Sequence, residues 1–256
     1  LPHLVGDPDQ APTMQHVAFG DAVGGLNGTA AVLTALWYKQ LTGEGQFVDL
    51  SQVECLFPLA APGILHQSVH GQTPQRFGNA HPDHAPHGVY PCHGEDAWAV
   101  IQVTEETQWH QLQAIIPALS EFGDLDERLA KREAIDECIG AWTQQRTASE
   151  VMQTLQAAGV TAAKLNNGQE LLDEPHLHDR GYLQWLERDH VGLQPHPSAP
   201  FRTAEEPIPI TSPSPTLGQH NHAILVDLLG LSTDELQQLE QLGVICLLYT
   251  SPSPRD

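Results

Sequence analysis

The amino-acid sequence predicts a mixed α/β protein, because segments with helical and with strand periodicity alternate along the chain. Apolar residues recur at helical intervals between positions 26 and 41, which indicates a long helix. Residues 97–103 form a short apolar run typical of a strand, and sequences typical of helix N-termini follow it. With 256 residues, 40% of them hydrophobic, the chain is long enough for a core of one or two domains.

The long helix begins beside a carboxylate that lies among glycines. Gly20 precedes Asp21, and Gly24 and Gly25 follow it, so that a ligand or another backbone segment can approach closely. The helix dipole at this end favours a negative charge. From spacing alone, Asp21 is best explained as an N-cap, since Asp is a common capping residue. A reactive carboxylate is the rarer alternative.

The segments after this helix predict a strand and a second helix. We expect the first helix to end at Gly43. Residues 46–50 predict a strand, with Phe47 and Asp49 on one side. Residues 53–65 predict a helix that is kinked near its prolines.

The middle of the chain carries the strongest local signals. Thr104 follows the strand at 97–103 and is expected to cap a helix that carries Trp109, Leu112 and Ile116. A helix is also expected at about 131–145. Thr147 and Glu150 match a capping box for the next helix, which Gly159 is expected to end.

The last third of the chain predicts short elements. Residues 160–165 indicate a strand, and residues 167–170 are expected to cap a short helix. The proline-rich stretch at about 190–216 is expected to be extended. Two short helices, 221–229 and 232–242, then close the pattern, and the second opens with a capping box from Ser232 to Glu235.

Composition limits the partners of the protein. The formal net charge is −21, with only 11 Lys and Arg residues, which argues against nucleic acid or an anionic membrane surface as a partner. No apolar run approaches the roughly 20 residues of a membrane-spanning helix. The four cysteines form no C-x-x-C pair, so we expect a reduced, cytoplasmic protein.

The segment H-P-D-H-A-P-H has the composition of a metal site. It contains His81, Asp83, His84 and His87, and both imidazole and carboxylate groups bind zinc. Its two prolines prevent a regular helix, however, and a chain with 15 histidines forms such clusters by chance. We therefore expect no metal here.

Three blocks of sequence resemble one enzyme family in the same order. The first is GDAVGG followed by TGEGQFVDLSQVE, and the second is RFGNAHPDHAPHGVYPC with AVIQVTEETQW. The third runs from 159 to 245 and includes ELLDEPHLHDRGY, LGQH and LLGLSTDEL. Together these blocks resemble the family III CoA-transferases, the CaiB/BaiF group.

The resemblance implies more about the fold than the pattern does. It implies part of a Rossmann-like large domain plus a smaller α/β domain, with a C-terminal segment that returns to the large domain, and an interlocked homodimer. The opening segment LPHLVGDPD resembles the middle of the family, a short distance before the catalytic aspartate, so we expect an N-terminal part to precede it. The implied domains are 1–66 (large domain), 67–190 (small domain) and 191–245 (returning segment), with 246–256 as a non-native tail that resembles a translated adaptor.

The resemblance also implies the chemistry. Asp21 occupies the place of the catalytic aspartate, which exchanges CoA between carboxylic acids through an anhydride and an aspartyl-CoA thioester. CoA is then a substrate, and no metal or redox cofactor is required. The residues expected in the substrate and CoA pocket are Gly24, Gly25, Gly78, Asn79, His84 and Glu106.

Two alternatives to this function stay open. In an α-methylacyl-CoA racemase of the same family, Asp21 acts as an acid/base on the α-carbon, and Glu106 stands near the place of a further carboxylate. The chain as given is alternatively an inactive fragment, because in the family much of the contact with CoA comes from the N-terminal part that we expect to precede these residues.

Overall fold

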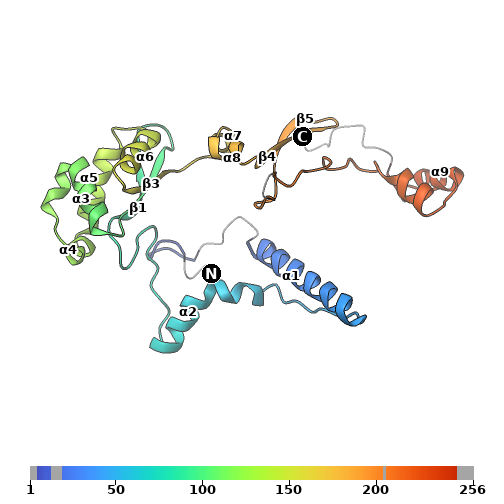
Figure 1. Ribbon diagram of the computed structural model, residues 1–256, viewed down its shortest axis with the longest axis horizontal. Coiled ribbons are helices and arrows are strands. Elements are labelled where there is room, and N and C mark those ends of the chain that lie inside the picture. The colour runs from blue at the N-terminus through green and yellow to red at the C-terminus, as the bar shows by residue number, and fades with distance from the viewer. Residues whose placement is uncertain (1–4, 13–18, 204–205, 247–256) are drawn as a thin grey trace. The chain divides into compact units, whose positions relative to one another are not determined.

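The computed structural model describes residues 5–12, 19–203 and 206–246. The chain forms two units, residues 1–165 and 166–256, which are considered separately below (Figure 1). No helix within the described ranges is both long enough and apolar enough to cross a membrane.

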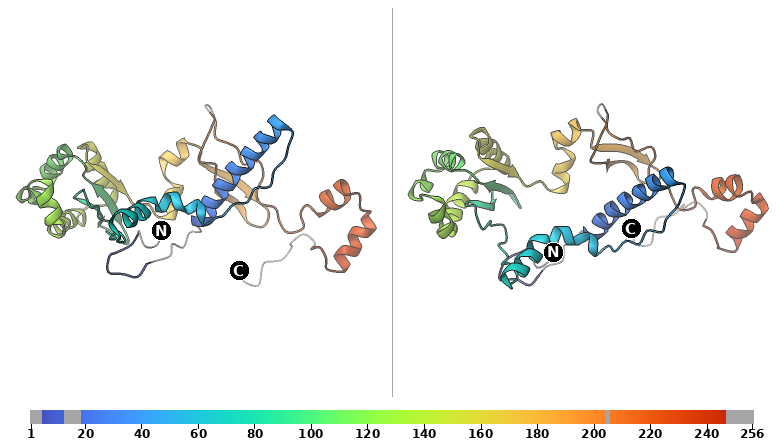
Figure 2. Two further views of the ribbon diagram at one scale, coloured as in Figure 1. Left: turned by 90° about the horizontal axis from the view of Figure 1, so that it is seen from below. Right: turned by 60° about the horizontal axis from the view of Figure 1, so that its bottom comes forward.

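The first helix, α1, spans Phe19–Thr42. Figure 2 shows it as one continuous rod, although it contains several glycines. Gly43 ends it with φ +81°, and the Gly43 N–H donates to the carbonyl of Lys39 at 2.8 Å, as a helix C-terminus requires. The predicted extent is therefore confirmed. The apolar side chains that predicted it are exposed, among them Leu26, Leu33, Trp37 and Leu41.

The strand predicted at 46–50 is wrong, because the segment between α1 and the next helix is irregular. A strand needs a hydrogen-bonded neighbour, and the two sheets of the described chain do not include this segment. A 3₁₀ turn, η1 (Glu54–Leu56), then leads into α2 (Phe57–His70). Pro62 lies inside α2, in agreement with the predicted proline-containing helix.

The centre of the first unit is a three-stranded antiparallel sheet. Its strands are β1 (His87–Pro91), β2 (Trp98–Gln102) and β3 (Thr161–Lys164), in the order β1-β2-β3. Five helical elements accompany the sheet, and they are α3 (Glu106–Ile115), η2 (Pro117–Glu121), α4 (Leu125–Ala130), α5 (Arg132–Thr143) and α6 (Ala148–Ala157) (Figure 1).

Local sequence rules account for most of these helices. Thr147 and Glu150 form the predicted capping box of α6, and Gly159 follows its end with φ +80°. The predicted cap at Thr104 is wrong, since α3 begins one residue later with Glu105 as its N-cap. The physical reason is that the Thr104 N–H and hydroxyl both donate to the side-chain oxygen of Gln108, at 2.9 and 3.2 Å.

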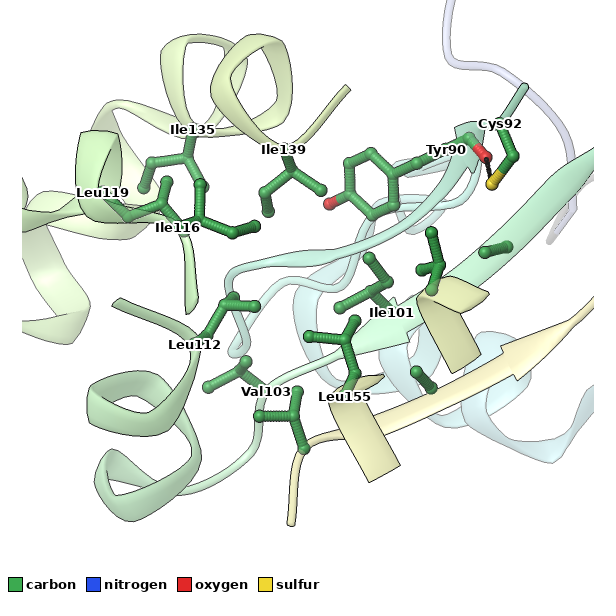
Figure 3. Close-up of a cluster of buried hydrophobic side chains, with 14 of the residues drawn as sticks. Tyr90, Cys92, Ile101, Val103, Leu112, Ile116, Leu119, Ile135, Ile139 and Leu155 are labelled. Carbon is green, nitrogen blue, oxygen red and sulfur yellow. Dashed lines mark hydrogen bonds between the residues drawn. The ribbon is translucent and has the colours of Figure 1, made fainter. Parts of the chain in front are cut away.

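One hydrophobic core joins the sheet to its helices. Figure 3 shows Ile101 of β2 and the adjacent Val103 beside Leu112 of α3 and Leu155 of α6. Side chains of α5 and η2 complete this core, namely Ile135, Ile139 and Leu119, all with 0% exposure. Burial of such side chains contributes about 1.5–3 kcal/mol each. The core therefore fixes the sheet against α3, α5 and α6.

The second unit consists of short elements. These are α7 (Gly168–Leu172), α8 (Pro175–Asp179), the hairpin of β4 (Leu183–Arg188) and β5 (Gly192–Pro197), the π-helix η3 (His222–Leu228) and α9 (Thr233–Gln241). The predicted capping box at Ser232 is present, and the predicted cap at Asn167 is also present, as a capping box with Glu170. The extended stretch predicted from 190 overlooked the hairpin, because prolines at an edge strand do not prevent pairing.

Candidate active site

Asp21 lies in the first turn of α1, as the third residue of the helix. It is therefore inside the helix, and the N-cap interpretation does not hold. Its side chain is exposed to solvent. A carboxylate here is favoured by the partial positive charge of the helix N-terminus. The position thus combines access from solvent with a setting that suits an anion.

A side chain from a distant part of the sequence reaches this carboxylate. The Nε2 atom of Gln52 donates a hydrogen bond to Oδ1 of Asp21 at 2.7 Å. Gln52 precedes η1, and η1 packs against α1. The Cys55 N–H donates to the Ser51 carbonyl at 3.2 Å and closes the turn that carries Gln52.

The glycines beside Asp21 differ in their surroundings. Gly24 is buried, and a Cβ atom there would lie 2.7 Å from Cγ of Gln52. A Cβ atom at Gly25 would meet no other atom within 4 Å. Gly24 and Gly25 are the sixth and seventh residues of α1, beyond the first four, whose N–H groups lack a helical partner. Among the described residues, the side-chain donor to Asp21 is thus the amide of Gln52.

The pocket residues predicted from the second sequence block form another group. Gly78 has φ +60°, and its N–H donates to the Gly6 carbonyl at 3.1 Å. The Asn79 carbonyl accepts from Nδ1 of His87 at 2.7 Å. These contacts tie the loop before β1 to the strand and to the segment near residue 6.

Three histidine rings lie close together at this loop, with His81 stacked on His84 and tilted against His87. The ring centroids of His81 and His84 are 4.5 Å apart, and those of His81 and His87 are 5.5 Å apart. Nδ1 of His81 accepts the Asp83 N–H at 3.1 Å. Burial and the neighbouring imidazoles hold the pKa of His81 below its ordinary value. Within the described ranges, no three His, Cys, Asp or Glu side chains are placed to hold one metal ion.

Glu106 is engaged in an ion pair. Its two carboxylate oxygens accept from Nη2 and Nη1 of Arg128, at 2.6 and 3.1 Å. The Nε atom of Arg128 donates to the Ala85 carbonyl at 3.0 Å, next to His84. The hydrogen bond from Arg128 lowers the pKa of Glu106. Glu106 is thereby linked to the histidine loop and is held as an anion.

A shallow cavity of about 800 Å³ opens between the loop, β1 and α5. Gly78 and Asn79 line it, together with Tyr90 and Asp136. The Tyr90 hydroxyl donates to Oδ1 of Asp136 at 2.6 Å, and burial raises the pKa of both groups. The cavity is therefore lined in part by a hydrogen-bonded pair that sequence reasoning did not identify.

The structure thus brings the predicted residues into two groups. Asp21, Gly24 and Gly25 share the N-terminal half of α1, whereas Gly78, Asn79, His84 and Glu106 lie around the loop before β1 and at the start of α3. Gln52 and Arg128 were missed. Their partners are 31 and 22 residues away in sequence, so no local spacing indicates either contact.

Comparison with known proteins places these features in a family. The family model described as CoA-transferase family III matches residues 1–221. The succinyl-CoA–D-citramalate CoA-transferase of Chloroflexus aurantiacus is 30% identical, over 94% of this chain and 61% of the relative. The succinate–glutarate CoA-transferase of Agrobacterium fabrum is 26% identical, over 88% of this chain and 57% of the relative. The chain spans about three fifths of the length of these relatives.

The fold agrees with the sequence comparison. The crystal structure of a CaiB/BaiF family protein from Brucella suis matches with a TM-score of 0.77 and 27% identity, over 88% of this chain and 59% of that one. This likeness confirms the predicted mixed α/β fold. The chain belongs to CoA-transferase family III.

Proposed function

We propose that the protein transfers CoA from succinyl-CoA to a second carboxylic acid and that Asp21 is its nucleophile. The observation that carries this proposal is an accessible carboxylate in the first turn of α1, with one oxygen bound by an amide donor. Family membership supports CoA transfer as the class of reaction. The Chloroflexus relative is named for succinyl-CoA and D-citramalate, and the Agrobacterium relative is named for succinate and glutarate, which makes succinyl-CoA the donor of choice.

The reaction proceeds by covalent catalysis. One oxygen of Asp21 attacks the thioester carbonyl of succinyl-CoA, forming a mixed anhydride and releasing CoA thiolate. The thiolate then attacks the aspartyl carbonyl, so that succinate leaves and an aspartyl-CoA thioester remains. The acceptor carboxylate attacks this thioester, and the same two steps in reverse yield the new acyl-CoA and free Asp21. The activated acyl bond is kept throughout, provided that water is excluded.

Trapping of the thioester tests the nucleophile directly. The protein expressed from its complete coding sequence is incubated with succinyl-CoA, quenched with borohydride and analysed by peptide mass spectrometry. Borohydride reduces an aspartyl thioester to the alcohol, so we expect homoserine at position 21. Asp21→Asn should abolish both this product and the transfer of CoA to acids such as glutarate. Asp126→Asn provides a matched control, since Asp126 is also exposed in the first turn of a helix.

The racemase is the alternative outcome of the same experiment. An unmodified Asp21, combined with exchange of the α-proton of a branched acyl-CoA in heavy water, would replace the transferase proposal. The geometry of Glu106 gives that alternative little support. An acid/base group must exchange its proton near neutral pH, whereas the guanidinium of Arg128 holds Glu106 as an anion.

A further inference from the structure

Gln52 holds one particular oxygen of the Asp21 carboxylate. Its amide Nε2 lies 2.7 Å from Oδ1, and the structure describes no comparable side-chain bond to Oδ2. We propose that Gln52 is a catalytic residue, whose amide stabilises the negative charge that develops on Oδ1 when CoA thiolate attacks the aspartyl carbonyl. This inference rests on the proposed function, because it assumes that Asp21 is acylated.

The chemistry assigns different tasks to the two oxygens. Among the described residues Oδ2 accepts no side-chain hydrogen bond, so in this proposal it forms the bond to the succinyl carbonyl and becomes the bridging oxygen of the anhydride. Oδ1 then becomes the carbonyl oxygen of the acylated Asp21. When the thiolate adds to this carbonyl, the electron pair of the C=O bond moves onto Oδ1. The electron pair on Oδ1 then re-forms the C=O bond, and the bond from the aspartyl carbon to Oδ2 breaks. Succinate leaves, and the aspartyl-CoA thioester remains.

The bridging oxygen leaves Asp21 in this step. The thiolate attacks the aspartyl carbon, and the bond from that carbon to the bridging oxygen breaks. The bridging oxygen, which began as Oδ2 of Asp21, therefore departs within the succinate. Oδ1 stays on Asp21 throughout, and no proton is transferred. A neutral amide donor is suited to such a step, since it strengthens its hydrogen bond to the developing oxyanion without giving up a proton.

The donor is already in position. An effective oxyanion donor lies about 2.7–3.1 Å from the oxygen that it stabilises, and the observed separation of 2.7 Å falls in this range. The turn from Ser51 to Cys55 holds the backbone of Gln52, and Leu56 packs toward Gly20 beside it. The amide therefore needs little reorganisation when charge develops on Oδ1.

Gly24 permits this arrangement. Its absent side chain leaves the space that Gln52 occupies, since a Cβ atom there would lie 2.7 Å from Cγ and 3.1 Å from Nε2 of Gln52. Any larger residue at this position would displace the amide from Asp21. The need for glycine one turn after Asp21 thus follows from the path of the Gln52 side chain.

Two substitutions of Gln52 test the inference in the protein expressed from its complete coding sequence. Gln52→Leu removes the donor, and Gln52→Glu keeps the shape of the side chain but replaces the donor with an acceptor. With succinyl-CoA and glutarate, we expect kcat to fall about 100-fold or more in both variants. The KM for succinyl-CoA should change far less, because the charge that the amide is proposed to stabilise develops only after succinyl-CoA has acylated Asp21. Formation of homoserine at position 21 should slow by the same factor.

A pair of glycine variants separates this role from a loss of folding. Gly24→Ala should slow the reaction like Gln52→Leu, because it displaces the amide. Gly28→Ala is the matched control in the same helix, where an added Cβ meets nothing within 4 Å, and it should keep the kcat of the unaltered protein. Thermal unfolding of all variants checks that they remain folded.

The outcomes distinguish the inference from the proposed function. If Asp21→Asn keeps its activity, the proposed function and this inference both fail. If Asp21→Asn is inactive while Gln52→Leu and Gly24→Ala keep the kcat of the unaltered protein, only the inference is overturned. A rise in KM with unchanged kcat would also overturn it, since Gln52 would then merely help to bind succinyl-CoA.

Discussion

The guanidinium of Arg128 is almost fully buried, with 2% of its side chain exposed, whereas the Glu106 side chain that it binds is 56% exposed. Burial thus fixes the position of Arg128, whereas Glu106 lies at the surface. Arg128 also donates to the carbonyls of Ala85 and Gly123 and stacks over the ring of Trp109. One buried side chain therefore links the histidine loop, α3 and the turn before α4.

Removal of Arg128 should destabilise the protein strongly. We expect Arg128→Met to lower the free energy of unfolding by about 3 kcal/mol, because two carbonyl groups and Glu106 lose their donor together. Lys131→Met is the contrast, since the Lys131–Glu127 pair is exposed on both sides and should contribute far less to stability than Arg128 does. Urea unfolding measures both. Equal losses in the two variants would contradict the anchoring role of Arg128.

The Tyr90–Asp136 hydrogen bond should give a pH-dependent effect. Burial raises the pKa of Asp136, and the bond from Tyr90 opposes this rise, so Tyr90→Phe should raise the pKa further. We expect a loss of about 1–2 kcal/mol in unfolding free energy at neutral pH. A carboxyl whose pKa is raised by folding gains stability as pH falls through that pKa, so the deficit should shrink on acidification.

Denaturant unfolding at neutral and at acidic pH measures this difference. Tyr38→Phe serves as the control, because Tyr38 is exposed on α1. A deficit for Tyr90→Phe that grows as pH falls would show that Asp136 is not the group that responds.

Protonation of His81 should loosen the loop before β1. Its pKa is lowered by burial and then by His84 and His87, with a further lowering by Arg132 and an opposite effect of Asp83. Because folding lowers the pKa of His81, neutral His81 contributes fully to the folding free energy above the ordinary pKa of 6.5. This contribution is lost as the pH falls from 6.5 through the lowered pKa. Protonation also fills the Nδ1 lone pair that accepts the Asp83 N–H.

Hydrogen exchange across this pH range tests the effect at the loop itself. The Asp83 amide should exchange faster relative to other amides as pH falls below 6.5. In His81→Phe, which cannot accept the bond, this amide should be unprotected at every pH. Protection of Asp83 that is independent of both pH and His81 would exclude the mechanism.

An alanine at Gly78 should meet two obstacles. Its φ of +60° disfavours a side chain, and an added Cβ would lie 2.8 Å from Oδ1 of Asp7. Gly71 has a similar φ of +69° but open space around it. We expect Gly71→Ala to cost about 1 kcal/mol and Gly78→Ala about 2 kcal/mol or more. Thermal unfolding compares them, and equal costs would show that Asp7 moves aside freely.

The predictions that hold rest on contacts between near neighbours. The capping boxes opened by Thr147 and Ser232 were predicted from a polar residue and a Glu three positions later, and the cap predicted at Asn167 forms a third such box. Both partners belong to one turn, so the sequence alone specifies the contact. The extent of α1 follows from helical periodicity and from Gly43 in the same way.

The predictions that fail concern competition or pairing. The strand at 46–50 requires a partner strand, which residues of that segment cannot encode by themselves. The cap predicted at Thr104 does not form, because the side-chain oxygen of Gln108 accepts hydrogen bonds from the Thr104 N–H and hydroxyl. The β4–β5 hairpin forms despite its prolines, because a two-stranded sheet offers edges where a missing N–H costs no bond.

The sequence by itself determined the family, the mixed α/β class and the choice of Asp21, because each depends on residue types in a fixed order. Only the tertiary structure decided which groups meet those residues. It brought Gln52 into contact with Asp21 and Arg128 into contact with Glu106. The partners lie far apart in the sequence, so the path of the chain between them decides whether they meet. The physical reason is that helices and caps arise from interactions within one turn, whereas a side chain's electrostatic setting depends on how distant segments pack.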